Sequence, residues 1–173
     1  MTKRIIYQND NGGVALITPA MNCGLTVEEI ARKDVPAGAR FAILDTADVP
    51  TDFTFFDAWE AEHSNLNDGV GIGANAWFIE KYKAEIATIN AEVAPVVPET
   101  LVAASKDQAG FPDDFTPEQI DAAYDELVAQ VAALNDHNTA AHAEAVAQWE
   151  ASKAQRIEQL NKQIAVQEEE MAA

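Results

Sequence analysis

The chain of 173 residues carries 29 acidic and 11 basic residues, which gives it a net charge of −18. A protein that binds nucleic acid in general needs a basic face to displace counterions, and this composition supplies none. Hydrophobic residues make up 48% of the chain but aromatic residues only 8%, which suits one domain with a modest core and an appendage.

No apolar run is long enough to span a membrane, and no run of signal-peptide length follows the basic start, Met1–Arg4. We therefore expect synthesis in the cytoplasm, with the protein used there or assembled there into a larger particle. Cys23 is the only cysteine, so an internal disulfide is excluded.

Two short apolar stretches joined by polar residues open the sequence, in IIYQNDNGGVALI. β-Branched and aromatic residues give Lys3–Gln8 and Val14–Thr18 a preference for strands. Between them, Asn9–Gly13 offers Asn-Gly and Gly-Gly pairs, which tolerate the positive φ angles of hairpin turns. The sequence therefore predicts a β-hairpin. An EF-hand calcium loop would need acidic ligands at alternate positions and a final glutamate, which are missing.

A helix start follows at Thr26, because a threonine N-cap with Glu29 three residues later forms a capping box. The helix is predicted to run to about Asp34, before Pro36 stops it. Apolar residues then alternate over residues 40–44, which predicts a third strand.

The densest aromatic stretch is FTFFDAW, whose aromatic residues are Phe53, Phe55, Phe56 and Trp59. Aromatic side chains bury large apolar areas, so we predict a short element here that closes the core of an N-terminal module. The alternative is an exposed patch that docks on a partner. On that alternative, the four aromatic side chains are interface candidates.

Glycine, asparagine and aspartate are frequent in residues 63–75, which predicts a flexible connector. Gly69, Gly71 and Gly73 form a G-x-G-x-G pattern. A dinucleotide-binding fingerprint requires G-x-G-x-x-G directly after a strand, and neither the last interval nor the preceding segment fits. We therefore expect no nucleotide site.

The second half of the chain is predicted to be largely helical. Apolar residues recur at steps of three and four over residues 76–93, which indicates a helix. Pro95 and Pro98 end it, and the weakly patterned segment 99–109 leaves room for one or two helical turns.

A second strong helix start lies at Thr116, with Pro117 at the first helical position and Gln119 completing a capping box. After it, apolar residues at alternating steps of four and three predict a coiled-coil seam. The first part of this seam is Ile120, Tyr124, Leu127, Val131 and Leu134.

Poor helix formers at residues 135–139 interrupt the seam, which resumes in a different phase. The second part is Val146, Lys153, Ile157, Leu160, Ile164 and Met171. The change of phase fits either a stutter in one long helix or a hinge between two antiparallel helices. Since a single apolar stripe cannot bury itself, we expect the seam to contact another chain. Its interface candidates are Leu127, Val131, Leu134, Ile157, Leu160 and Ile164.

No catalytic or ligand-binding pattern stands out. His63, His137 and His142 are scattered, and the last two are five residues apart, whereas zinc-binding pairs on helices are four apart. Serine-hydrolase, P-loop and paired cysteine–histidine signatures are absent from the sequence. We therefore expect no catalytic residue, no cofactor and no metal site.

Three stretches of the N-terminal third share a recognisable pattern: RIIYQNDNGGVALITPA, GLTVEEIARKDVPAG and ADVPTDFTFFDAWEAE. They contain I-Y-x-N-D-x-G-G-V, L-T-x-E-E-I-A-x-K-D-V-P-x-G and A-W-E, within Arg4–Pro19, Leu25–Gly38 and Val49–Glu60. In these stretches the chain resembles the N-terminal module of small proteins encoded among the tail genes of tailed bacteriophages. The resemblance implies a setting in a phage tail, in a tail fibre or in its assembly, and it brings no catalytic residues with it.

The expected fold is α+β, with a small N-terminal module that contains a β-hairpin and a long helical, partly coiled-coil region after it. The expected divisions are an α+β module over 1–62, a Gly/Asn connector over 63–75, a helix with a proline-containing connector over 76–115, and a long helix or helical hairpin over 116–173.

We expect a structural component of a phage tail, either a tail fibre protein or a fibre or baseplate adaptor, located in the virion. Its expected partners are further copies of itself and other tail or baseplate proteins, with no nucleic acid and no membrane span. The alternative is a tail fibre assembly chaperone that is absent from the virion. A third reading, a small enzyme or lytic accessory factor, lacks a recognisable site.

Overall fold

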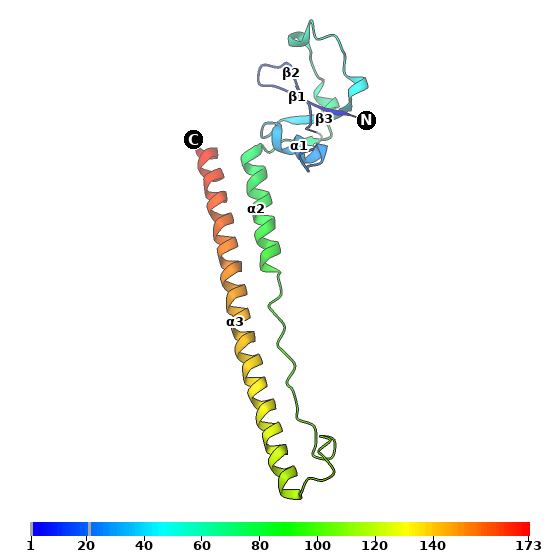
Figure 1. Cartoon of the computed structure of the whole chain (residues 1–173). Coiled ribbons are helices and arrows are strands. Elements are labelled where there is room, and N and C mark those ends of the chain that lie inside the picture. Colours follow the sequence, from blue (N-terminus) through cyan, green and yellow to red (C-terminus); the bar gives the residue numbers. More distant parts are fainter. Residues whose placement is uncertain (1, 21) are drawn as a thin grey trace. The chain divides into compact units, whose positions relative to one another are not determined.

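The structure, a computed structural model, describes residues 2–20 and 22–173 (Figure 1). The chain divides into two compact units, and each is described by itself. The first unit comprises residues 1–87 and 159–173, and the second comprises residues 88–158. The first holds a four-stranded antiparallel sheet with helices, and a single long helix ends the chain, so the fold is α+β as the sequence predicts.

The hairpin at the start of the chain is confirmed. Strand β1 (Lys3–Gln8) pairs antiparallel with strand β2 (Val14–Ile17). Asn9 organises the turn, since its Oδ1 accepts hydrogen bonds from two backbone amides of the loop, at 3.0 and 3.1 Å. Gly12 supplies the positive φ angle of +84° that the turn requires. Much of the hydrogen-bonding capacity of the loop is thus taken up within the loop itself.

Helix α1 (Val27–Asp34) begins at the predicted capping box. Thr26 Oγ1 accepts a hydrogen bond from the Glu29 amide at 3.1 Å, and Glu29 Oε2 accepts one from the Thr26 amide at 3.0 Å. Strand β3 (Arg40–Asp45) then pairs antiparallel with β1 on the side away from β2.

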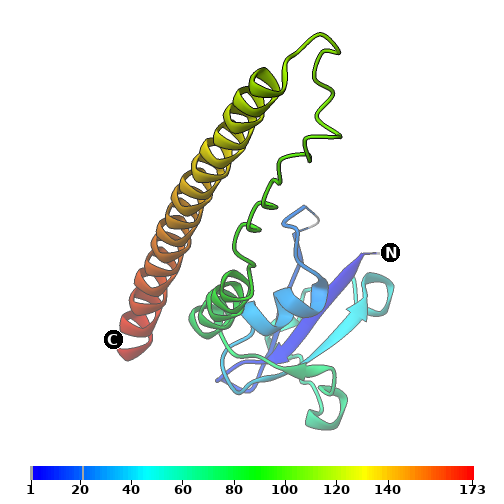
Figure 2. The same ribbon diagram turned by 90° about the horizontal axis from the view of Figure 1, so that it is seen from below.

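One face of the sheet packs against α1 to form the core of the first unit (Figure 2). The buried residues of this core are Ile5, Ile30, Ala31, Val35 and Phe41. Each of them is at most 4% exposed, so α1 and the two central strands β1 and β3 enclose a dry interior.

Residues 63–75, predicted as a flexible connector, instead complete the sheet. They contain a 3₁₀ turn, His63–Asn65, and strand β4 (Gly69–Val70), which pairs antiparallel with β3. Leu66, between these two elements, is 1% exposed. The strand order of the sheet is therefore β2-β1-β3-β4.

The glycines of this segment allow its close approach to the rest of the unit. A Cβ on Gly69 would lie 2.6 Å from the ring of Phe41. A Cβ on Gly71 would lie 2.3 Å from the carbonyl oxygen of Val35 and 2.6 Å from that of Pro36. Packing thus explains Gly69 and Gly71, because only residues without a side chain fit at these two positions, whereas Gly73 supplies a positive φ angle of +79°.

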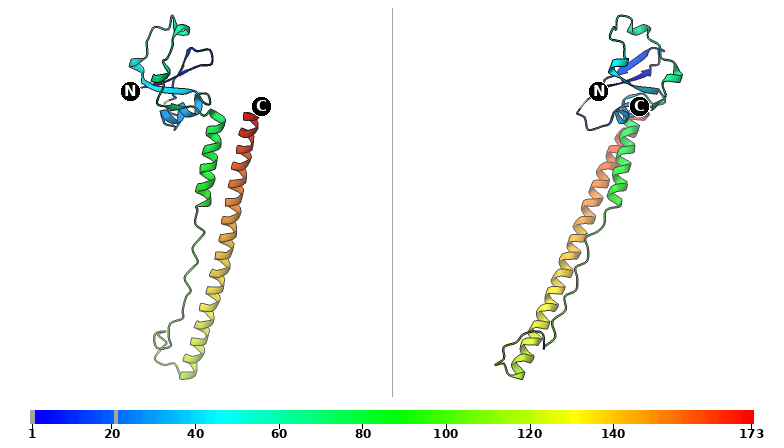
Figure 3. Two further views of the ribbon diagram at one scale, coloured as in Figure 1. Left: turned by 180° about the vertical axis from the view of Figure 1, so that it is seen from behind. Right: turned by 90° about the vertical axis from the view of Figure 1, so that its right-hand side faces the viewer.

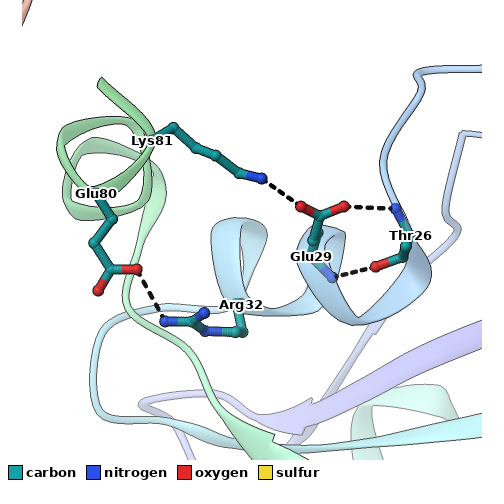
Figure 4. Close-up of polar contacts among 5 residues, drawn as sticks. All are labelled: Thr26, Glu29, Arg32, Glu80 and Lys81. Atoms are coloured by element: carbon teal, nitrogen blue, oxygen red, sulfur yellow. Dashed lines mark hydrogen bonds and ion pairs between the residues drawn. The ribbon is translucent and has the colours of Figure 1, made fainter. Parts of the chain in front are cut away.

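Helix α2 (Ala74–Asn90) follows directly and is tied to α1 by two ion pairs (Figure 4). Lys81 Nζ donates to Glu29 Oε1, and Arg32 Nη2 donates to Glu80 Oε2 at 3.0 Å. The Glu29 carboxylate therefore serves both the start of α1 and the contact with α2.

Helix α3 (Pro117–Ala172) is one continuous helix of 56 residues, so the single-helix alternative is correct (Figure 3). Its predicted capping box is present, with the Thr116 amide donating to Gln119 Oε1 at 2.7 Å and the Gln119 amide donating to Thr116 Oγ1 at 3.3 Å. Residues 91–116, all of which the structure describes, contain no helix, so the turns allowed for 99–109 do not form as a helix.

We predict that Gly71→Ala lowers the free energy of unfolding of the first unit by about 3 kcal/mol, because the new methyl group would overlap backbone carbonyl oxygens that cannot move independently. Chemical denaturation followed by circular dichroism measures the change. Gly13→Ala is the control, since a Cβ there would meet only the Asn9 side chain, at 3.5 Å or more. Equal unfolding midpoints for the two variants would contradict the prediction.

Glu29 has a lowered pKa, because Lys81 and the Thr26 amide both donate hydrogen bonds to its carboxylate. The ionised form therefore stabilises the fold above the unfolded-state pKa of about 4.5, and this contribution is lost as the pH falls through the lower folded-state pKa. Glu29→Gln should melt at a lower temperature than the wild-type chain at pH 7.

The difference in melting temperature should shrink as the pH falls below the ordinary glutamate pKa and through the lower folded-state pKa, where the wild-type carboxyl group loses its charge as well. Glu28→Gln is the control, because it removes a charge from the same helical turn and leaves the Glu29 contacts in place. A melting difference that stays constant across the acid range would show that the charge on Glu29 does not matter.

Candidate docking surfaces

The face of the sheet opposite α1 carries a second apolar patch. Ile6, Ala42 and Leu44 point to this side, because they alternate along their strands with residues that face α1. Together with Val14 they form the floor of a groove of about 740 Å³, which we call the sheet groove. Val14 and Ala42 are 7% and 3% exposed, so only part of the floor meets solvent.

Residues 46–66 supply the walls of the sheet groove. Val49 and Trp59 both line it, and Val49 is 6% exposed. The far end of this segment is fixed to the sheet, since Arg40 Nε donates to the carbonyl oxygen of Leu66 at 2.8 Å. The groove is therefore built between a regular sheet and a long loop that is anchored to it.

The rim of the sheet groove is acidic. Asp48, Glu60 and Glu62 line it, and no lysine or arginine does among the residues described. Glu62 accepts a hydrogen bond from Ser64 Oγ at 3.4 Å, while Asp48 and Glu60 form no ion pair within residues 2–20 and 22–173. The groove thus combines an apolar floor with three acidic side chains at its rim.

The aromatic stretch does not close the core as predicted. Phe53 and Phe55 are 49% and 73% exposed, and Phe56 and Trp59 are partly buried. The rings of Phe53, Phe56 and Trp59 contact one another, with centroids 5.0–5.7 Å apart. Helix α1 already covers the core face of the sheet, so these rings pack on each other. Trp59 lines the sheet groove, which lies on the opposite face of the sheet.

Within the described residues, no group of three or more histidine, cysteine, aspartate or glutamate side chains is arranged to hold a metal ion. The same part of the chain has no helix with the length and apolar content that crossing a membrane requires. Cys23 is exposed, and its Sγ donates a hydrogen bond to the carbonyl oxygen of Ala20 at 3.3 Å.

The less exposed side chains of α3 form one stripe with an 11-residue spacing, in place of the predicted heptad seam. Between residues 124 and 164 the α3 stripe is Tyr124, Leu127, Val131, Asn135, Asn138, His142, Val146, Trp149, Lys153, Ile157, Leu160 and Ile164. Steps of three, four and four recur, which gives about 3.67 residues per turn. The change of phase is thus a stutter in one helix, and Asn135 and Asn138 continue the stripe instead of breaking it.

The predicted interface residues of α3 fall into three groups. Leu160 and Ile164 are each 8% exposed, in the first unit, where the last turns of α3 lie beside α2 (Figures 1 and 3). Leu127, Val131 and Ile157 are partly buried in the stripe, and Leu134 lies beside it at 46% exposure. The premise that the stripe cannot bury itself within one chain is therefore wrong for Leu160 and Ile164.

In the second unit, side chains fasten the extended segment 91–116 to α3. Asn135 Oδ1 accepts a hydrogen bond from the Leu101 amide, and Asn135 Nδ2 donates to the Leu101 carbonyl oxygen, both at 2.9 Å. Lys106 donates to Asp121, and this ion pair raises the pKa of the lysine. The extended segment thus has a defined register along the helix.

The same segment carries a row of exposed apolar side chains, which we call the valine row. Its members are Val93, Val96, Val97 and Val102, at 86%, 87%, 72% and 87% exposure. A run of large apolar side chains this open to water is typical of a surface that another protein covers. Pro95 and Pro98 lie within the row and keep the chain from forming a helix.

Comparison with protein-family models, with curated proteins and with solved structures gave no match. The candidate docking surfaces are the sheet groove with its aromatic neighbours in the first unit, and the valine row in the second.

Proposed function

We propose that the protein is a structural component of a bacteriophage tail, either a tail fibre protein or a fibre or baseplate adaptor, which acts by oligomerisation and docking. The valine row carries this proposal, because four valines at 72–87% exposure need a partner surface to leave water. The N-terminal stretches that resemble tail-gene products supply the setting.

The two units divide the work in this proposal. The second unit associates with further copies of the chain through the valine row, and the first unit docks on another tail or baseplate protein through its sheet groove. A net charge of −18 keeps free subunits apart by repulsion, so contacts form only where apolar surfaces fit together.

The alternative is an assembly chaperone that leaves before the particle is complete. The valine row is compatible with this reading as well, because an exposed extended segment can cover an apolar surface of an unassembled fibre protein. Both readings require the same surface and differ in whether the contact persists.

Mass spectrometry of purified phage particles separates the two readings. We expect the protein at a fixed copy number relative to a known tail protein, because a structural component stays in the particle. Absence from purified particles, together with presence in lysates of infected cells, would favour the chaperone and contradict the structural role.

Self-association has its own test. We predict that Val97→Asp/Val102→Asp lowers the mass of the full chain in sedimentation equilibrium, since each carboxylate would have to be buried unpaired in the contact. The chain should keep its helical circular dichroism, because both side chains are exposed. Val166→Asp, at an exposed valine outside the row, is the control. A wild-type chain that sediments as a monomer would contradict the prediction.

A further inference from the structure

We infer that the sheet groove binds an extended segment of a different protein, one that carries large apolar side chains flanked by lysine or arginine. This inference rests on the proposed docking role of the first unit and names the chemistry of the partner. It follows from the floor of the groove, the charge at its rim and the charge of the chain's own exposed segments.

The floor selects apolar side chains. Ile6, Ala42 and Leu44 present only hydrocarbon, and Val49 and Trp59 add apolar surface from the loop. A volume of about 740 Å³ is large enough for several side chains of a bound segment. Burial of apolar groups against this floor supplies the affinity, as in other docking sites with a desolvated centre.

The groove has few hydrogen-bond donors that could orient a small ligand rich in acceptors, such as an anion or a sugar phosphate. Trp59 and Asn65 are the only lining residues, among those described, whose side chains can donate a hydrogen bond. A peptide does not depend on such donors, because its orientation can be set by the positions of successive side chains along the groove. The composition of the groove therefore favours a peptide segment.

The rim selects positive charge. Asp48, Glu60 and Glu62 border the apolar floor without a lysine or arginine among the lining residues. Exposed ion pairs add little affinity each, but a carboxylate rim rejects acidic segments and speeds the approach of basic ones. A partner with lysine or arginine beside its apolar residues compensates this charge.

A second copy of the chain is a poor occupant. Its exposed apolar segment, the valine row, contains Glu99 and no lysine or arginine, so it would bring like charge to the rim. The whole chain is also strongly acidic, at −18. The occupant is therefore a different and more basic protein.

Selection from a random dodecapeptide library on the immobilised full chain tests the inference. The enriched peptides should carry net positive charge and at least two large apolar residues. A fluorescein-labelled peptide of the consensus sequence then gives a dissociation constant by fluorescence anisotropy. Enrichment of acidic or uncharged peptides, or of none, would overturn the inference.

Charge variants test the rim with that labelled peptide. Glu60→Lys/Glu62→Lys should weaken binding by about tenfold or more, since it reverses two of the three rim charges. Glu28→Lys/Asp107→Lys changes the net charge equally at exposed positions outside the groove, and it should leave binding nearly unchanged. Equal weakening by both double variants would show that the overall charge of the chain causes the effect, and it would overturn the proposed site.

Aromatic variants test the wall. Trp59→Ala should weaken binding by about tenfold or more, because it removes a large apolar contact from the groove. Phe55→Ala is the matched control, since this ring belongs to the same loop, is 73% exposed and does not line the groove. Both rings are in a loop outside the core, so the variants should fold. Equal affinities for the two variants would place binding elsewhere.

A synthetic peptide of residues 91–104 of the chain itself serves as competitor. It should fail to displace the labelled peptide, and displacement would overturn the assignment to a different protein in favour of a second copy. These binding measurements use the isolated chain and do not depend on the content of phage particles. A failure of peptide binding is therefore distinguishable from absence of the protein in the virion.

Discussion

The first unit depends on one close backbone contact, between Gly71 and the carbonyl oxygens of Val35 and Pro36. This contact places β4 on the sheet and brings the chain to Gly73, whose φ of +79° turns it into α2. The two ion pairs between α1 and α2 are exposed, so they add little stability and act within a geometry that the backbone has already set. Strand β4 and helix α2 can therefore take up their positions only because residue 71 has no side chain.

Features with a local cause could be predicted from the sequence. The hairpin turn, the capping boxes at Thr26 and Thr116 and the end of α1 before Pro36 each depend on residues a few positions apart, and each forms as expected. Strand β4 could not be found in this way, because two residues carry no periodicity and the contact that selects glycine comes from residues far earlier in the chain. The exposure of the aromatic stretch has a similar origin, since α1 already occupies the core face of the sheet.

The α3 stripe shows how polar residues can hide a continuous pattern. In the sequence, Asn135 interrupts a series of apolar residues. In the structure, its side-chain amide forms hydrogen bonds with both the backbone amide and the carbonyl oxygen of Leu101. A helix that packs against an extended chain of its own molecule needs such partners, whereas a seam between two helices would be weakened by them. The candidate docking surfaces were predictable in part. The aromatic stretch can be identified from the sequence, but the floor of the sheet groove depends on the register of three strands, which the sequence does not specify.

The strand order leaves β2 and β4 at the two margins of the sheet, and neither margin offers much to a further strand. β4 has two residues and gives way at once to Gly71, while β2 has four and is followed by Pro19, which has no amide hydrogen to donate. Short margins of this kind hinder the edge-to-edge pairing by which sheets from separate molecules merge into aggregates. Contact between molecules is thereby directed to side-chain surfaces, which can distinguish one partner from another, and away from the backbone, which cannot.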